Sequence, residues 1–254
     1  MKKLLATDLD GTLLKDNKLT MENENAVKKL IKSKNLLVIS TGRPYNGVNN
    51  LIQENNINAD YYILLNGALI LDGLGNSINQ RIIEKDIIKD ILDYVIEENF
   101  YISVESGFFT YMLTEGVEIP YYNKKSANSI NEISEEISLI SLYNPSMDIN
   151  KIENIKNNIN KKYGDYIIAY RNDIYIDIVP VGCSKGNALK ALVEKENNIE
   201  ENVYAIGDSW NDISMFEVVK NSFTFHHVED ELKKYATYLV SSVSECINKF
   251  ILKN

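Results

Sequence analysis

Two residue types on which many catalytic and metal sites depend are scarce in this chain of 254 residues. The two cysteines, Cys183 and Cys246, are far apart and lack the spacing of metal ligands, which favours a reducing compartment. The two histidines, His226 and His227, are adjacent, so the chain offers few histidines from which a Ser-His-Asp triad could be built. Because neighbours in a strand point to opposite faces, we expect these histidines to be structural or at the surface rather than to share a metal ion.

Long apolar runs and an excess of basic residues are also missing. No apolar run approaches the ~20 residues that a membrane-spanning helix needs, and the apolar stretch at the start stops at Asp8, which is too short for a signal peptide. The net charge of -9 at pH 7 argues against nucleic acid or an anionic membrane as a partner. A small phosphorylated substrate stays compatible, since a local cation can hold it. We therefore expect a cytoplasmic protein with no nucleic-acid or membrane partner.

The chain does have an alternation of strand and helix patterns towards both ends. Short apolar runs predict buried strands, and amphipathic stretches between them predict helices. Continuous apolar strands separated by helices are typical of a parallel sheet covered on both faces. The expected strands are Lys3–Thr7, Leu36–Ser40, Tyr61–Leu65 and Val203–Ile206. Helices are expected to start near Thr20, Pro44 and Lys185, and a further helix is expected to run through Ile213 and Phe216.

The middle of the chain follows a different pattern. Helical stretches at Ile82–Asn99 and Ile149–Lys162 are each followed by two aromatic and β-branched runs. The runs are separated by short polar turns at Ser106-Gly107 and at Asn172-Asp173, which predicts antiparallel pairs. We therefore expect an α/β fold. A Rossmann-like parallel-sheet core made of residues 1–80 and 183–254 would be interrupted by an inserted α+β domain of residues 81–182.

The first expected strand ends in two aspartates, within the stretch DLDGTLL at Asp8–Leu14. Side chains two apart in a strand point to the same side, so Asp8 and Asp10 would stand close together. Like charges that close cost free energy unless a cation or a shared proton relieves them. The pair is either a solvated turn or part of a site.

Polar residues follow the other expected strands as well. In an open parallel sheet, ligands bind outside the carboxyl ends of the strands, so these groups would converge on one edge. They are Ser40, Thr41, Gly42 and Arg43 after the second strand, Asp208, Asn211 and Asp212 after the strand Val203–Ile206, and Lys185 at the preceding helix.

Four of these segments together resemble the motifs of the haloacid dehalogenase-like (HAD) phosphohydrolases. DLDGTLL, STGR, SKGNAL and GDSWND match the four family motifs in the family's order. Asn66-Gly67-Ala68 also matches a segment common in the Cof-type subgroup. That subgroup carries an α/β cap between its second and third motifs, where the insertion at 81–182 is expected, so the resemblance runs nearly end to end.

The resemblance implies a role for each matching residue. Asp8 would be the nucleophile that forms an aspartyl-phosphate, and Asp10 would be general acid and then general base. Thr41, in preference to Ser40, would donate its hydroxyl to a phosphoryl oxygen, and Lys185 would balance charge between Asp8 and the phosphate. The other positions implied at the substrate or phosphate are Gly42, Asn66, Gly67 and Asn211.

The resemblance also implies Mg²⁺ as the cofactor. Its ligands would come from Asp8, the backbone carbonyl of Asp10, and Asp208, with Asp212 acting on the metal or its waters. Oxygen ligands of this kind suit a hard divalent ion. The ion and Lys185 would relieve the repulsion between the aspartates.

Two features depart from the subgroup. The segment NSFTFHHVED replaces a stretch that is usually made of small residues, and Trp210 is larger than the usual residue in the fourth motif. We expect the bulky residues Phe223–His227 to alter a loop near the sheet edge and with it the outer wall of the pocket. The tyrosines of the insertion are expected mostly in its core, with some lining a substrate pocket; they are Tyr101, Tyr111, Tyr121, Tyr122, Tyr170 and Tyr175.

The sequence therefore predicts a Mg²⁺-dependent phosphomonoesterase, a monomer or weak homodimer, acting on a small phosphorylated metabolite. Sugar phosphates come first, with flavin nucleotides and pyridoxal phosphate as further substrates that the resemblance allows. A phosphosugar mutase is the alternative among enzymes. A non-hydrolytic sensor of a phosphorylated ligand is the alternative from another class, although such a protein is expected to lose Asp8 or Asp10.

Overall fold

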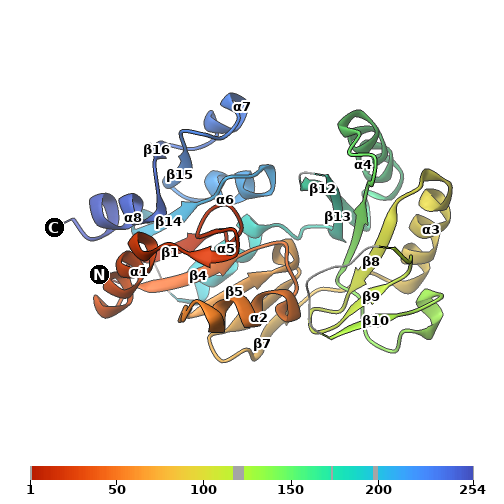
Figure 1. Cartoon of the computed structure of the whole chain (residues 1–254), viewed down its shortest axis with the longest axis horizontal. Helices are drawn as coiled ribbons and strands as arrows, with labels where there is room; N and C mark the ends of the chain where they lie inside the picture. The colour runs from red at the N-terminus through yellow and green to blue at the C-terminus, as the bar shows by residue number, and fades with distance from the viewer. Residues whose placement is uncertain (1, 117–122, 173, 197–199, 254) are drawn as a thin grey trace.

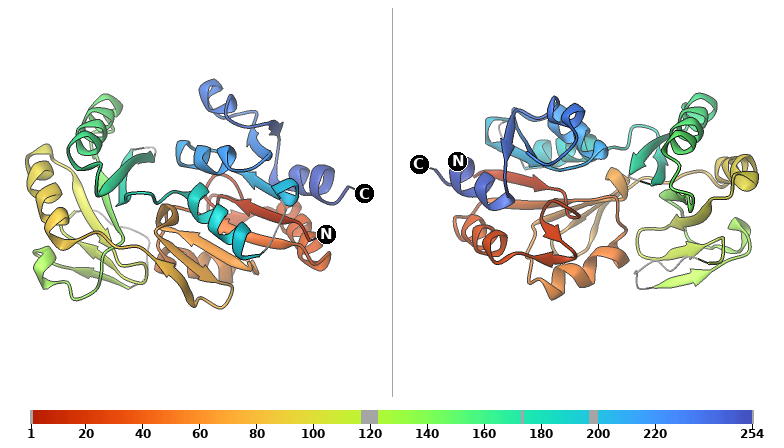
Figure 2. Two further views of the ribbon diagram at one scale, coloured as in Figure 1. Left: turned by 180° about the vertical axis from the view of Figure 1, so that it is seen from behind. Right: turned by 45° about the horizontal axis from the view of Figure 1, so that its top comes forward.

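The computed structural model of the chain describes residues 2–116, 123–172, 174–196 and 200–253. They form two lobes, one built from both ends of the chain and the other from its middle (Figure 1). Two separate stretches of chain cross between the lobes, as the view from behind also shows (Figure 2).

The first lobe contains a sheet whose described strands follow the order β16-β15-β14-β1-β4-β5-β6-β7. Neighbours from β16 to β5 are parallel. Beyond β5, the strands β6 and β7 extend the sheet as an antiparallel hairpin, which the sequence patterns did not predict. The strands are β1 (Leu4–Thr7), β4 (Leu36–Ser40), β5 (Tyr61–Leu64), β6 (Leu69–Asp72), β7 (Ser77–Gln80), β14 (Val203–Ile206), β15 (Asn221–Phe225) and β16 (Tyr238–Val240).

Apolar side chains on both faces of this sheet are covered by helices. Leu5 and Leu37 belong to one buried cluster together with residues of α1, α2 and α8, whereas Leu4 and Val38 belong to a second cluster with residues of α5 and α6. This explains why the strands are continuous apolar runs. The helices are α1 (Met21–Lys32), α2 (Tyr45–Glu54), α5 (Lys185–Lys195), α6 (Ile213–Glu217), α7 (Asp230–Lys233) and α8 (Val243–Cys246). The expected α/β fold with a parallel-sheet core is confirmed.

The starts of two helices follow from local capping. The side chain of Thr20 accepts a hydrogen bond from the backbone N–H of Asn23, as expected for the N-cap of α1. Ser184 caps α5 in the same way, which makes Lys185 the first residue of that helix. Pro44 lies one position earlier than expected, at the N-cap rather than in the first turn of α2.

The second lobe contains a sheet with the strand order β10-β9-β8-β11-β13-β12 among the described residues. The expected antiparallel pairs β8/β9 and β12/β13 are confirmed; of the turn at Asn172-Asp173, residue Asp173 lies outside the described residues. The elements are β8 (Tyr101–Glu105), β9 (Thr110–Met112), β10 (Lys124–Ser126), β11 (Leu139–Tyr143), β12 (Ile167–Asn172), β13 (Tyr175–Pro180), α3 (Lys85–Val95) and α4 (Ile149–Tyr163).

The two faces of this second sheet differ in polarity. Ile102 and Val104 of β8 lie in an apolar cluster with residues of α3 and α4. Ser103 and Glu105 alternate with them and, because side chains alternate along a strand, point to the opposite face. Asp177 stands between Ile176 and Ile178 of β13 in the same manner. One face of the sheet is therefore buried under helices, and the other presents polar groups.

Short elements complete the described chain. They are the ribbon of β2 (Leu14–Lys15) and β3 (Lys18–Leu19), the short helices η1 (Leu65–Gly67), η2 (Ile96–Glu98), η3 (Ile130–Glu132), η4 (Glu200–Asn202) and η5 (Trp210–Asp212), and the π-helical turn η6 (Ile247–Ile251). Within the described residues, none of the helices combines the length and the apolar character needed to cross a membrane. The division at residues 80/81 and 182/183 stays a prediction; it falls between β7 and α3 and between β13 and α5.

Candidate active site

The chain turns sharply where β1 ends, directly after Asp8. Gly11 has a φ of +76°, and a Cβ atom there would lie 2.2 Å from Oδ2 of Asp208. A residue with a side chain would therefore be strained in its backbone and would push Asp208 away. Next to this glycine, the hydroxyl of Thr12 donates a hydrogen bond of 2.9 Å to Oδ1 of Asp208. The first motif thus brings Asp8 to the site and also positions a carboxylate from the fourth motif.

Three carboxylates gather at this edge of the sheet. Each of Asp8, Asp208 and Asp212 offers an oxygen, and these oxygens lie within 4.8 Å of one another. Lys185 is buried with an exposed fraction of 1%. Its Nζ lies 2.7 Å from Oδ1 of Asp8 and 2.6 Å from Oδ1 of Asp212. Asp212 is held from its other oxygen, which accepts hydrogen bonds of 3.0 Å from the backbone N–H groups of Asp208 and Ser209.

Burial and mutual repulsion change the protonation of these groups. Burial raises the pKa of Asp8 well above its usual value; Lys185 opposes this, while Asp212 and Asp208 add to it. Burial, with Asp212, raises the pKa of Asp208 to about 6. Burial alone would lower the pKa of Lys185, but Asp212 and Asp8 outweigh it and raise that pKa above the usual lysine value. Lys185 therefore stays charged, whereas the carboxyl groups of Asp8 and Asp208 resist ionisation.

One lysine does not balance three clustered carboxylates. If all three ionise, the group carries a net negative charge in a largely buried place, which is costly unless a further cation binds. Oxygen-only ligands are those preferred by Mg²⁺. The donor set therefore fits the divalent ion that the sequence predicts.

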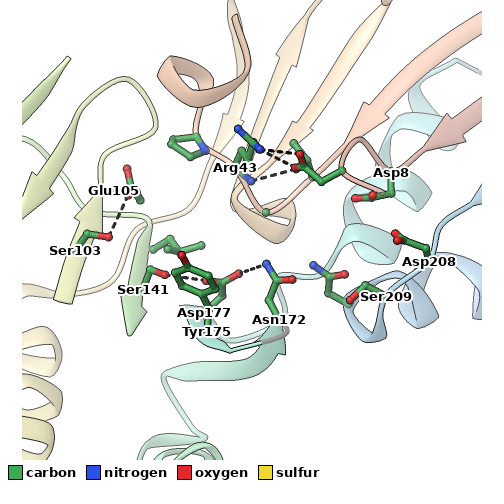
Figure 3. A pocket seen from close by; sticks show the side chains of 16 residues that line it. Asp8, Arg43, Ser103, Glu105, Ser141, Asn172, Tyr175, Asp177, Asp208 and Ser209 are labelled. Atoms are coloured by element: carbon green, nitrogen blue, oxygen red, sulfur yellow. Dashed lines mark hydrogen bonds and ion pairs between the residues drawn. The ribbon is translucent and has the colours of Figure 1, made fainter. Parts of the chain in front are cut away.

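Asp10 lies outside this group of three. Its side chain is 44% exposed and forms a two-pronged ion pair with Arg43, in which Nε donates to Oδ2 and Nη2 to Oδ1, both at 2.7 Å. Both residues line the cavity, and Figure 3 marks the hydrogen bonds of Arg43 with dashed lines. The sequence placed Arg43 at the same edge without giving it a partner, so this ion pair is new information.

The second motif places Thr41 and Gly42 in the cavity wall, whereas Ser40 is buried and does not line it. A Cβ atom on Gly42 would lie 3.3 Å from the amide of Asn66 and from Oδ2 of Asp177. Gly42 therefore allows the second lobe to approach this loop closely.

Asn66 and Gly67 hold neighbouring segments together and are not among the residues that line the cavity. Asn66 accepts a hydrogen bond of 3.1 Å from Nδ2 of Asn211 and donates one of 3.1 Å to Asp177. Gly67 has a φ of +94°, and a Cβ atom there would lie 2.2 Å from the carbonyl oxygen of Ser184. Asn211 does line the cavity, and its Oδ1 is buried without a hydrogen-bond partner among the described residues.

A cavity of about 470 Å³ lies between the lobes, with Asp8 and Asp208 on one side and a wall from the second lobe on the other (Figure 3). Sequence analysis anticipated only Tyr175 in that wall. The alternation of polar with apolar residues in the strands was the signal that could have identified the others. The described wall residues from the second lobe are Ser103, Glu105, Leu139, Ser141, Asn172, Tyr175 and Asp177.

The expectation that Phe223 and Phe225 alter a loop at the outer wall is wrong. Phe223 and Phe225 lie in the buried strand β15 rather than in a loop, and they pack in the core, away from the cavity. His226 and His227 follow that strand in an exposed turn. Trp210 does not line the cavity either; the guanidinium carbon of Arg171 in β12 lies 5.9 Å from its ring centroid. Of the tyrosines, Tyr121 and Tyr122 lie outside the described residues.

The chain is similar to known proteins along nearly its whole length. The family described as haloacid dehalogenase-like hydrolase matches residues 5–251. A putative phosphatase of Streptococcus pyogenes is 29% identical, covering 98% of each chain. A 5-amino-6-(5-phospho-D-ribitylamino)uracil phosphatase of Bacillus subtilis is 28% identical, over 96% of this chain and 94% of the relative. A solved structure of a haloacid dehalogenase-like hydrolase from B. subtilis has a TM-score of 0.87 at 24% identity, over 98% of this chain and 100% of the other.

Proposed function

The chain belongs to the haloacid dehalogenase-like hydrolase family and is a phosphatase of that family, and we propose that it hydrolyses phosphomonoesters of a small metabolite with the help of Mg²⁺. The observation that carries this proposal is the buried contact of Lys185 with Asp8 and Asp212, next to Asp208 and beside the cavity. In this proposal, residues 1–80 and 183–254 would form the catalytic core, and residues 81–182 would form the cap that closes over the substrate.

Asp8 is the proposed nucleophile. One of its carboxylate oxygens attacks phosphorus, the bond from phosphorus to the leaving oxygen breaks, and an aspartyl-phosphate forms. Lys185 holds Oδ1 of Asp8 at 2.7 Å, so the other oxygen is the one available for attack. The hydroxyl of Thr41, in the wall of the cavity, would donate to a phosphoryl oxygen, and the backbone at Gly42 would lie against the same group.

Asp10 is the proposed general acid and base. It would give a proton to the leaving oxygen, then take one from the water that attacks the aspartyl-phosphate, so that phosphate leaves and Asp8 is restored. In the structure its two oxygens are bound by Arg43. Asp10 would therefore exchange Arg43 for the leaving group when substrate enters.

Asp8, Asp208 and the backbone carbonyl of Asp10 would hold Mg²⁺, with Asp212 and Asn211 supporting its waters. Bound there, the ion would neutralise negative charge on the phosphoryl group. The buried Oδ1 of Asn211, which has no hydrogen-bond partner among the described residues, would gain a donor from such a water or from the substrate.

A sugar phosphate or a related polyol phosphate is the proposed substrate class. The relative from B. subtilis is named for a phosphorylated ribityl compound, in which the phosphate sits on a polyol chain. The hydroxyl and amide groups of the cavity wall suit such a leaving group.

The proposal is tested by phosphate release from p-nitrophenyl phosphate and a panel of sugar phosphates, with Mg²⁺ and with EDTA, for wild type and Asp8→Asn. Release that needs the metal and disappears in the variant supports the proposed reaction. No release by folded, Mg²⁺-loaded wild type, combined with ligand-dependent thermal stabilisation, would favour the non-hydrolytic sensor instead.

A further inference from the structure

The wall of the cavity opposite Asp8 contains two buried carboxyl groups that the proposed reaction does not use, Glu105 and Asp177. Glu105 ends β8 and lies across the cavity from Asp8 and Asp208 (Figure 3). Among the described lining residues, Arg43 is the one cationic side chain, and it is bound to Asp10. The wall around Glu105 therefore offers hydrogen-bonding groups without a positive charge.

The surroundings of Glu105 fix the direction of its hydrogen bonds. The hydroxyl of Thr110 accepts a hydrogen bond of 3.0 Å from Nδ2 of Asn46 and donates its own proton, over 2.6 Å, to Oε2 of Glu105. Asn46 belongs to α2 of the first lobe, so this arrangement is anchored in both lobes. Oε1 has a single weak contact in the described structure, with the hydroxyl of Ser103 at 3.4 Å. Oε1 is thus the oxygen left to interact with a ligand.

Burial also decides the charge of this group. It raises the pKa of Glu105 to about 8; the hydroxyls of Thr110 and Ser103 lower it in part, and Asp177 raises it further. Among the described residues no cation forms an ion pair with it, and the titratable group that acts on it is Asp177, whose own pKa is raised by burial. At neutral pH Glu105 is then mainly a neutral carboxyl whose proton sits on Oε1, because Oε2 already accepts from Thr110. Such a group can both donate and accept a hydrogen bond, as a sugar hydroxyl can.

We propose that Glu105 is a specificity-determining residue that binds a hydroxyl of the leaving group through Oε1, so that the enzyme selects neutral, polyhydroxylated phosphoesters over those with a second anionic group. This inference rests on the proposed phosphatase function and deepens it. A second anion would be held beside the buried carboxyl of Asp177, in a wall whose described residues offer no cation to balance it. A neutral polyol would instead satisfy these groups. Sites that hydrogen-bond a substrate hydroxyl discriminate strongly because their own polar groups are otherwise left unpaired.

The class of substrate is tested with matched probes on wild type in Mg²⁺. Sorbitol 6-phosphate and 6-phosphogluconate share an open six-carbon chain and differ by one neutral or anionic terminal group. We expect kcat/KM to be at least about tenfold higher for sorbitol 6-phosphate, because its terminal hydroxyl can pair with Glu105 whereas the carboxylate of 6-phosphogluconate would be buried without a cation. Equal or better turnover of 6-phosphogluconate would overturn the proposed selection.

The role of Glu105 is tested with Glu105→Ala and Glu105→Gln. The readout is the ratio of kcat/KM for sorbitol 6-phosphate to that for p-nitrophenyl phosphate, which has no hydroxyl to bind. Ala should lower this ratio about tenfold, mainly through KM, and Gln should restore it to within about threefold of wild type because an amide also donates and accepts. An unchanged ratio in Ala overturns the proposal. A second result would also overturn it: the Gln variant has as low a ratio as Ala, and wild type prefers glucosamine 6-phosphate, which carries an amino group, over sorbitol 6-phosphate. Recognition would then depend on a charged Glu105.

Binding separates this proposal from the proposed reaction. Sorbitol 6-phosphate is titrated calorimetrically into Asp8→Asn and into Asp8→Asn combined with Glu105→Ala. About tenfold weaker binding in the double variant supports Glu105 even if wild type turns over none of the phosphoesters, a result that would count against the phosphatase function alone. Equal binding in both proteins counts against Glu105 whatever the turnover. Circular dichroism of each variant confirms that it is folded.

Discussion

The two lobes differ in how they bring polar groups to the shared cavity. In the first lobe the charged residues follow the ends of parallel strands, within a few residues of a glycine turn, and they meet in a tight buried group around Lys185. In the second lobe they alternate with apolar residues inside antiparallel strands and form a spread-out wall with Glu105 and Asp177. The first arrangement suits chemistry at one atom, and the second suits recognition of an extended leaving group.

If this contrast holds, substitutions in the first lobe should abolish the reaction, whereas those in the second should change affinity and stability by smaller amounts.

The largest effect is expected for Lys185→Met. It leaves the buried carboxylates of Asp8 and Asp212 without their cation, and breaking a buried pair costs roughly 3–5 kcal/mol. We expect a loss of that order in the free energy of unfolding and a fall in kcat of at least about 10³-fold, since an electrostatic contact at the reacting group is removed. Urea unfolding and phosphate release measure the two. Near-normal kcat in a folded Lys185→Met protein would contradict the proposed role.

Gly11→Ala should come next. The new Cβ would lie 2.2 Å from Oδ2 of Asp208 and would force that carboxylate to move. We expect Mg²⁺ to bind at least about tenfold more weakly, seen as a smaller rise in melting temperature with added Mg²⁺. Gly182→Ala is the matched control, because Gly182 has a similar φ of +79° but open space around its Cβ position. A weakening that is equal in the two variants would trace the effect to backbone strain rather than to Asp208.

The third prediction concerns pH and the second lobe. The pKa of Glu105 is raised from its ordinary 4.5 to about 8 in the folded protein. Below pH 4.5 the carboxyl is protonated in both states, and between pH 4.5 and 8 it ionises only on unfolding, so stability falls as pH rises through this window. The loss is at most about 1.4 kcal/mol per pH unit. Urea unfolding of Glu105→Gln from pH 5 to 8 should show a flatter profile than wild type; parallel profiles would mean that Glu105 is ionised when folded.

Asp177→Ala should have the smallest effect of the four. Asp177 accepts hydrogen bonds from Asn66 at 3.1 Å, Asn172 at 3.2 Å and Ser141 at 3.1 Å, and it links the second lobe to the first. Leaving these donors unpaired costs about 1–3 kcal/mol. We expect a lower urea midpoint and a KM raised a few-fold with little change in kcat. Asp165→Ala, at an exposed site of the same lobe, is the control and should change neither.

The sequence was most informative where one residue and its immediate neighbours decide the structure. Thr20 and Ser184 predict helix starts because the capping hydrogen bond lies within three residues. Asp8 and Asp208 could be assigned to one edge because parallel strands deliver their carboxyl ends together, whereas Lys185 was assigned there as the start of the helix before β14. Where the outcome depends on packing, the sequence misled: Phe223 and Phe225 suggested a loop, but their burial beneath α8 and η6 places them in a strand of the core.

The ion pair of Asp10 with Arg43 and the wall around Glu105 could not be read from the sequence. Asp10 and Arg43 are 33 residues apart, and the side-chain rotamers that join them are set by the surrounding fold. Glu105 looks like an ordinary residue of a half-buried strand. Only the position of the second lobe shows that its polar face borders the cavity and that Thr110 and Asn46 fix its hydrogen bonds.

The sequence by itself determined the strands β1, β4, β5 and β14, the helices α1, α2 and α5, the glycine turn after Asp8 and the set of charged residues at the edge of the parallel sheet. These depend on side-chain periodicity and on backbone conformations that act over a few residues. The tertiary structure decided which polar groups face one another across the cavity, and which of them are charged. Those properties depend on burial and on distances between segments far apart in the chain, which local pattern does not specify.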